Sequence, residues 1–100
     1  MELKWLRRWP ENADTDPVLI RHFTQQQRVW LSRRCRRGGL AWLLLQVGQE
    51  YLLFDGETAA IIVGRAPRGA LLRGASRYWP RGLRHSELVE CLAGRQSSAS

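Results

Sequence analysis

Two histidines and two cysteines are the residues of this chain best suited to metal binding or nucleophilic chemistry. If His22 and Cys35 lie on one helix, a rise of about 1.5 Å per residue separates them by ~20 Å, too far to ligate one ion. His85 and Cys91 are six residues apart, and no CxxC or HxxxH spacing occurs in the chain. We therefore expect no metal site and no cofactor, and we interpret both cysteines as free thiols.

The carboxylates do not suggest a catalytic pair. Asp16 precedes Pro17, an arrangement typical of a helix N-cap. Glu87 and Glu90 fall early in an expected helix, where the helix dipole favours negative charge. GxSxG, GxxxxGK[ST] and GxGxxG motifs are absent from the sequence. We therefore expect a binding protein and not an enzyme.

Arginine dominates the charge of the chain. The formal net charge is +7, and fifteen of the sixteen basic residues are arginine, Lys4 being the exception. Residues 17–49 and residues 65–86 each hold six arginines and no acidic residue. Such segregation can produce a surface of one sign, which attracts polyanions and speeds encounter with them. The expected partners are DNA or RNA, or else an acidic protein.

The nucleic-acid hypothesis assigns phosphate contacts to arginines of both segments and base stacking to nearby aromatic residues. The candidate residues are Arg33, Arg34, Arg36, Arg37, Arg65, Arg68, Arg73, Arg77, Arg81, Arg84, Tyr78 and Trp79. The sequence carries no helix-turn-helix, zinc-finger, RRM or KH signature. The contacts we expect are therefore with the nucleic-acid backbone.

The elements that must position these residues begin with a predicted short N-terminal helix. Trp5, Leu6 and Trp9 recur at helical spacing, and Pro10 ends the helix after about two turns. An acidic loop over residues 11–15 follows it.

A long amphipathic helix is predicted over residues 16–37. Asp16 would be its N-cap, and Gly38–Gly39 would supply its C-cap. The side chains expected on its apolar face, packed against a sheet, are Leu19, Phe23 and Trp30.

Residues 40–54 predict a β-hairpin. The strands 40–47 and 50–54 are joined by Gly48–Gln49, a two-residue connection typical of a type II′ turn. Pairing Val47 with Glu50 fixes the register. The cross-strand pairs are then Leu45 with Leu52 and Leu43 with Phe54 on one face, and Gln46 with Tyr51 and Leu44 with Leu53 on the other.

The remaining elements are predicted from turn and cap signals. Asp55–Gly56 is typical of a type I′ turn and leads into a third strand over residues 58–63. Residues 70–79 fit either a fourth strand or a helix ended by Pro80, and Gly74 makes us favour the strand. Ser86 is expected to cap a short helix over residues 87–93, and residues 96–100 are expected to form a disordered tail.

These elements predict one α+β domain over residues 1–95. It comprises an antiparallel β-meander of three to four strands packed by one long amphipathic helix, with short helices at both ends. The sequence shows neither a membrane span nor a targeting signal, so we expect a cytoplasmic protein without membrane contact.

The second face of the predicted sheet offers an alternative function. We expect this apolar face to be at least partly covered, by the terminal helices or by a second copy of the chain in a homodimer. If it is open to a partner, the protein is a protein-protein interaction module, such as an adaptor, inhibitor or regulatory subunit. Its interface residues would be Trp42, Leu44, Tyr51 and Leu53.

Overall fold

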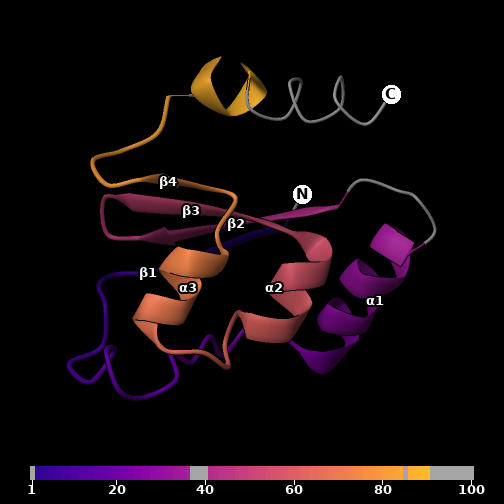
Figure 1. Ribbon diagram of the computed structural model, residues 1–100, viewed down its shortest axis with the longest axis horizontal. Coiled ribbons are helices and arrows are strands. Elements are labelled where there is room, and N and C mark those ends of the chain that lie inside the picture. The colour runs from indigo at the N-terminus through magenta and orange to yellow at the C-terminus, as the bar shows by residue number, and fades with distance from the viewer. Residues whose placement is uncertain (1, 37–40, 85, 91–100) are drawn as a thin grey trace.

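The structure is a computed structural model that describes residues 2–36, 41–84 and 86–90 (Figure 1). A mixed four-stranded sheet of order β1-β2-β3-β4 has β1 parallel to β2, while the other neighbours are antiparallel. The elements are β1 (Glu2–Leu6), α1 (Gln25–Arg36), β2 (Trp42–Val47), β3 (Glu50–Asp55), α2 (Gly56–Ile62), α3 (Arg68–Gly74) and β4 (Arg77–Trp79), followed by a helical segment at residues 86–90. The α+β prediction is confirmed, whereas the purely antiparallel meander and the single long helix are wrong.

The β2–β3 hairpin follows the predicted register. Val47 pairs with Glu50, and the predicted pairs beyond it all occur. Gly48 has φ of 61°, whereas no residue other than glycine has positive φ in the described ranges. A single positive φ at the first turn position agrees with the type II′ prediction.

The predicted N-terminal helix is wrong, because residues 2–6 form the edge strand β1 beside β2. Its side chains alternate between the two faces of the sheet. Leu6 packs against the core beneath the sheet, and Leu3 and Trp5 lie on the opposite face, where Trp5 is 57% exposed. Pairing with a distant strand therefore outweighs the local helical spacing of the apolar residues.

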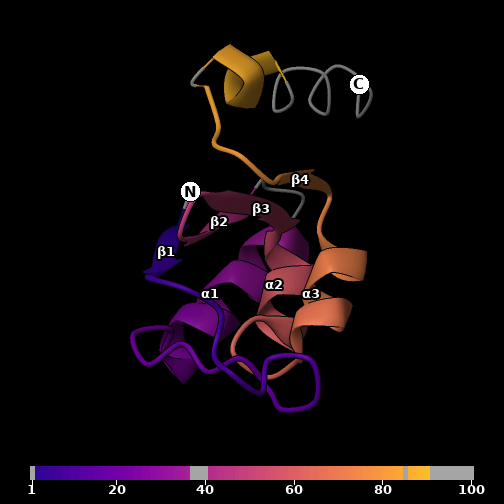
Figure 2. The same ribbon diagram turned by 90° about the vertical axis from the view of Figure 1, so that its left-hand side faces the viewer.

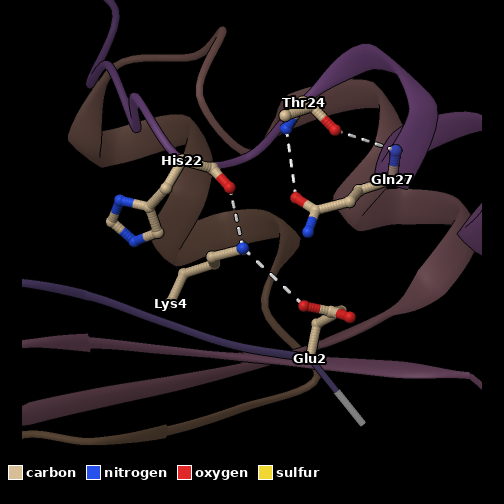
Figure 3. A network of polar contacts seen from close by, with 5 residues as sticks. All are labelled: Glu2, Lys4, His22, Thr24 and Gln27. Atoms are coloured by element: carbon tan, nitrogen blue, oxygen red, sulfur yellow. Dashed lines mark hydrogen bonds and ion pairs between the residues drawn. The ribbon is translucent and has the colours of Figure 1, made fainter.

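A buried lysine fastens β1 to the chain that leads into α1 (Figure 3). The Nζ atom of Lys4 donates a hydrogen bond of 2.8 Å to the carbonyl oxygen of His22 and lies 3.7 Å from Oε2 of Glu2. These partners satisfy an ammonium group that burial would otherwise leave without its water shell.

Helix α1 begins later than predicted because Thr24 and Gln27 form a capping box (Figure 3). The Thr24 backbone N–H donates to Oε1 of Gln27 at 3.1 Å, and the Gln27 backbone N–H donates to Oγ1 of Thr24 at 3.2 Å. Residues 16–24 are not helical. There Val18 and Ile20 are buried while Leu19 is exposed, an alternation that fits extended chain.

The expected apolar face of the long helix is therefore wrong at two of its three positions. Phe23 is buried but precedes α1, Leu19 is exposed, and Trp30 is 51% exposed. The guanidinium of Arg34 lies 5.4 Å from the Trp30 ring, one helical turn away, so this indole packs beneath a charged side chain on the surface. Residue 37 and the predicted C-cap at residues 38–39 lie outside the described residues.

Helix α2 replaces the predicted third strand. Asp55 caps this helix instead of opening a turn: its Oδ1 accepts a bond of 2.8 Å from the Thr58 backbone N–H, and its Oδ2 accepts one from the Thr58 hydroxyl. A Cβ added to Gly56 would lie 3.0 Å from Sγ of Cys35 on α1. The glycine thus allows α2 to approach α1 closely.

The prediction of a strand over residues 70–79 is correct only in part, because this segment contains the end of a helix followed by a short strand. Its first half belongs to α3, in which Leu71 is fully buried, and its second half contains the short strand β4. The helix ends because Ala75 is already extended, with its backbone N–H bonded to the carbonyl oxygen of Leu71.

The sheet has an inner face beneath which α1, α2 and α3 lie, and an outer face toward residues 86–90 (Figure 2). The inner face contributes Leu43, Leu45, Val47, Leu52 and Phe54 to the main core. A smaller cluster on the outer face contains Trp42, Leu44, Leu53 and Leu88. None of the helices in the described ranges is long and apolar enough to cross a membrane.

The C-terminal helix is present where it can be described, at residues 86–90, but its first turn begins before Ser86. The Leu88 backbone N–H bonds to the carbonyl oxygen of Arg84, and Oε2 of Glu87 accepts from the Arg84 backbone N–H at 3.3 Å. The carboxylate of Glu87 therefore caps this turn, in place of the predicted Ser86 cap. Residues 91–93 of the predicted helix and the predicted tail lie outside the described residues.

Candidate anion-binding site

A groove of about 400 Å³ lies between α1 and α2, which run side by side in both views (Figures 1 and 2). Four of its lining residues are arginines, so we call it the arginine groove. Its walls are formed by Gln25, Arg28, Val29, Ser32, Arg33, Arg36, Ala60, Ile61 and Arg65.

Helical periodicity brings these side chains together. Arg28, Ser32 and Arg36 recur every four residues of α1 and form one row along the helix, with Gln25, Val29 and Arg33 forming the neighbouring row. From Arg28 to Arg36 the helix rises about 12 Å at ~1.5 Å per residue. Opposite these rows, α2 contributes Ala60 and Ile61, and Arg65 follows the end of α2. The packing of α1 against α2 thus brings arginines from two separate segments of the chain into one groove.

Arg28 is the buried member of the arginine groove, with 8% of its surface exposed. Its Nη1 atom donates a bond of 3.1 Å to the carbonyl oxygen of Ala60, near the C-terminus of α2, where the helix dipole favours a cation. The ring of Phe23 lies 4.4 Å from its guanidinium carbon and adds a cation–π contact. These neutral partners hold the guanidinium in place without neutralising its charge.

Gly64 makes room for Arg28. It has φ of +81°, a conformation that L side chains rarely adopt, and a Cβ at this position would lie 2.6 Å from Nη2 of Arg28. The glycine therefore serves both the turn after α2 and the position of the buried guanidinium.

The arginine groove contains no carboxylate to balance its charge. The side chains that line it include no acidic residue. Within residues 2–36, 41–84 and 86–90, no arginine forms an ion pair, and Arg65 donates instead to Oε1 of Gln25 at 3.0 Å. Burial lowers the pKa of Arg28 from its ordinary value, and the positive charge of Arg65 lowers it further. The negative charge of an anion in the groove would oppose both effects by favouring the charged form of Arg28.

The structure separates the predicted nucleic-acid residues into different regions. Arg33, Arg36 and Arg65 are exposed in the arginine groove, whereas Arg34 stacks on Trp30 outside its lining. The others for which a position is described lie away from the groove lining, namely Arg68, Arg73, Arg77, Arg81 and Arg84. Arg37 lies outside the described residues. The groove thus brings together Arg33, Arg36 and Arg65 of the predicted residues, and the other described ones lie outside its lining.

Tyr78 and Trp79 do not form one stacking surface. As neighbours on β4 they point to opposite faces of the sheet, Tyr78 in register with Leu52 and Trp79 with Tyr51. The Tyr78 hydroxyl donates to Oε1 of Glu50, and this bond, assisted by burial, raises the pKa of Tyr78. Trp79 packs against the outer-face cluster.

The chain itself covers the predicted interface residues on the outer face, although Leu3 and Trp5 of β1 are exposed on that face. Leu53 is 0% exposed and Trp42 is 7% exposed, and both pack in one cluster with Leu88 from the helical segment. Leu44 belongs to the same cluster, and Tyr51 is partly buried against it. The expected partial covering of this face is confirmed. A partner would reach these side chains only after the segment around Leu88 moved away.

Sequence reasoning missed Arg28, Gln25 and Ser32 as members of the site. On the predicted long helix these residues lie away from the expected apolar face, and residues 58–63 are predicted as a strand, so no second helix is expected beside them. The available signal was the row Arg28, Ser32 and Arg36, facing a segment that contains small residues such as Ala60 and Gly64.

The described residues contain no group of three or more His, Cys, Asp or Glu side chains arranged to hold a metal ion. Cys35 is a free, half-buried thiol, and Cys91 lies outside the described residues. Comparison with family models, with curated proteins and with solved structures finds no significant match to this chain. Functional interpretation therefore depends on the geometry of the arginine groove.

Proposed function

We propose that this protein binds the phosphate backbone of DNA or RNA through the arginine groove and catalyses no reaction. The observation that carries the proposal is the local charge: four guanidinium groups line one groove that holds no acidic residue. A guanidinium group donates parallel hydrogen bonds to phosphate oxygens, and it is more weakly hydrated than an ammonium group. Arg33, Arg36 and Arg65 are exposed and can reach such a ligand.

Three features support the arginine groove as the binding site. Within the part of the chain that the structure describes, its arginines form no ion pairs, so their attraction for an external anion is not cancelled. The positions on α1 are fixed by the helix, which lowers the entropy lost on binding. The surface is also part of a chain of net charge +7, which accelerates encounter with a polyanion.

The alternative of a protein-protein interaction module relies on the apolar outer face. Burial of Leu53 and Trp42 in one cluster with Leu83 and Leu88 favours the arginine groove over that face, because a partner would first have to displace these two leucines. An acidic protein is the other ligand that the groove could attract, and homodimer formation and cytoplasmic location stay predictions.

Salt dependence of binding tests the proposal. Fluorescence anisotropy of a labelled single strand and a labelled duplex should give log-log salt slopes of about 0.7 and 0.9 per contacted phosphate, respectively, because each contact releases counterions. The variant Arg33→Gln/Arg36→Gln/Arg65→Gln should lower the slope by roughly 2 units on the single strand and should weaken all sequences alike. All three side chains are exposed, so the fold should persist.

The matched control removes the same charge elsewhere. Arg7→Gln/Arg8→Gln/Arg21→Gln alters exposed residues outside the arginine groove and should leave most of the slope intact. Equal losses from the two triple variants would mean diffuse attraction to a basic protein and no site. A third variant, Arg77→Gln/Arg81→Gln/Arg84→Gln, asks whether the second predicted arginine segment contributes. Absence of binding at about 0.15 M salt would contradict the proposal.

A further inference from the structure

We infer that the arginine groove is selective for a phosphate monoester, the dianionic group found at a phosphorylated strand end or on a free phosphorylated small molecule. The inference rests on the proposed function, since it assigns a ligand class to the same site. It comes from the buried charge of Arg28 and from the number of guanidinium groups around one opening.

No acidic side chain among the described residues pairs with Arg28, although a counter-ion there would stabilise it. The side chain is 8% exposed, and it contacts the carbonyl oxygen of Ala60 and the ring of Phe23, neither of which carries a formal charge. Burying a charge is unfavourable unless it is paired, and Arg65 adds repulsion. An anion bound beside Arg28 supplies the missing pairing.

The rim of the arginine groove favours a group with several charges and several free oxygens. Arg33, Arg36 and Arg65 add three guanidinium forks to that of Arg28. A terminal phosphate monoester presents three free oxygens and a charge of about −1.5 to −2 near neutral pH. A phosphodiester within a strand carries one charge on two free oxygens, because its other two oxygens are bonded to the neighbouring sugars. The monoester therefore satisfies more of these donors.

The size of the arginine groove agrees with a ligand larger than the phosphate alone. Its volume of about 400 Å³ falls within the ~300–1,000 Å³ range of small-ligand pockets. The neutral lining residues Gln25, Val29, Ser32, Ala60 and Ile61 offer hydrogen bonds and apolar contact to the attached group. A terminal nucleotide and a free mononucleotide share this chemistry.

Paired probes distinguish selectivity from general attraction to phosphate. Anisotropy would compare one single-stranded decamer bearing a 5′-phosphate with the same decamer bearing a 5′-hydroxyl, with inorganic phosphate and a free mononucleotide as competitors. At about pH 7.5 the phosphorylated decamer should bind roughly tenfold tighter, because its terminal phosphate adds a negative charge and a further charge-assisted hydrogen bond. The preference should shrink at about pH 5.5, because the monoester takes up a proton with a pKa near 6. The described residues that line the groove include no histidine and no carboxylate side chain.

Two variants connect the preference to the arginine groove. Arg33→Gln/Arg65→Gln changes exposed side chains and should bring the affinity ratio close to one, whereas Arg7→Gln/Arg21→Gln should preserve it. Arg28→Met removes the buried charge and should abolish the preference in folded protein, with circular dichroism as the check on folding. If Arg28→Met does not fold, the double variant of exposed residues still decides the question.

The outcomes separate the two proposals. Equal, salt-dependent binding of both decamers would overturn monoester selectivity and leave backbone binding standing. Direct binding of a fluorescently labelled mononucleotide, without measurable binding of either decamer, would support the monoester site and overturn nucleic-acid binding. A preference that survives in Arg33→Gln/Arg65→Gln would place the monoester elsewhere and overturn the inference. Absence of all binding would overturn both.

Discussion

Replacement of Gly64 by alanine should destabilise the fold by about 2–4 kcal/mol and weaken the arginine groove at the same time. At φ of +81° an L side chain adds roughly 1–2 kcal/mol of backbone strain. The new Cβ would lie 2.6 Å from Nη2 of Arg28, the end of a flexible side chain, so the guanidinium would move aside. Its charged hydrogen bond to Ala60, worth about 1.5–3 kcal/mol, would be lost in part.

Urea unfolding followed by tryptophan fluorescence measures this change in the free energy of unfolding. In thermal unfolding, each kcal/mol of destabilisation should lower the Tm by roughly 4–8 °C in a domain of this size. A double-mutant cycle with Arg28→Met isolates the steric part. In the Arg28→Met background only the backbone strain remains, so Gly64→Ala should cost about 1–2 kcal/mol less than in the parent. Equal destabilisation by Gly64→Ala in the two backgrounds would refute the idea that glycine is required at position 64 to make room for Arg28.

Three further predictions address the caps, the outer face and a tyrosine. Thr24→Ala should destabilise the protein by about 1 kcal/mol in urea unfolding because α1 loses its capping box, while Thr24→Ser should be nearly neutral; equal losses would contradict the cap. Leu88→Ala should cost about 2 kcal/mol or more, whereas Val89→Ala, at a half-exposed position, should stay within about 0.5 kcal/mol; the reverse order would contradict the covered outer face. The pKa of Tyr78 should fall toward its ordinary value in Glu50→Gln, as measured by ultraviolet titration, and an unchanged pKa would argue against the hydrogen bond. Because the folded-state pKa is raised, the stabilisation from this contact is complete below the unfolded-state pKa and disappears as the pH rises through the folded-state pKa.

The elements that could be predicted from sequence are those specified by neighbouring residues. Gly48–Gln49 and the alternation around it define the β2–β3 hairpin locally, so its turn and register are confirmed. Strand β1 is different, because its pairing partner β2 lies far along the chain and only the parallel pairing distinguishes the strand from a short helix.

Helix starts were mispredicted where two local signals compete. Asp16–Pro17 and the Thr24 to Gln27 capping box both mark a helix start, and the burial of Val18 and Ile20 in extended chain decides for the second. Asp55–Gly56 likewise fits a turn or an N-cap, and close packing of Gly56 against Cys35 of α1 favours the helix. The arginine groove forms only because the segment after Asp55 is a helix that packs against α1. Arg33, Arg36 and Arg65 could be named from charge alone, whereas the buried role of Arg28 could not.

The parallel pairing of β1 with β2 determines the order in which the sheet can assemble. A two-residue turn joins β2 to β3, whereas residues 7–41 separate β1 from β2. Loop-closure entropy grows with loop length, and contacts between distant residues form late because that entropy is lost before they can compensate for it. The hairpin with α2 and α3 should therefore fold first, and β1 should dock onto an existing sheet. Lys4 then fixes the entrance to α1, so the arginine groove acquires its final shape only when the N-terminal strand is in place.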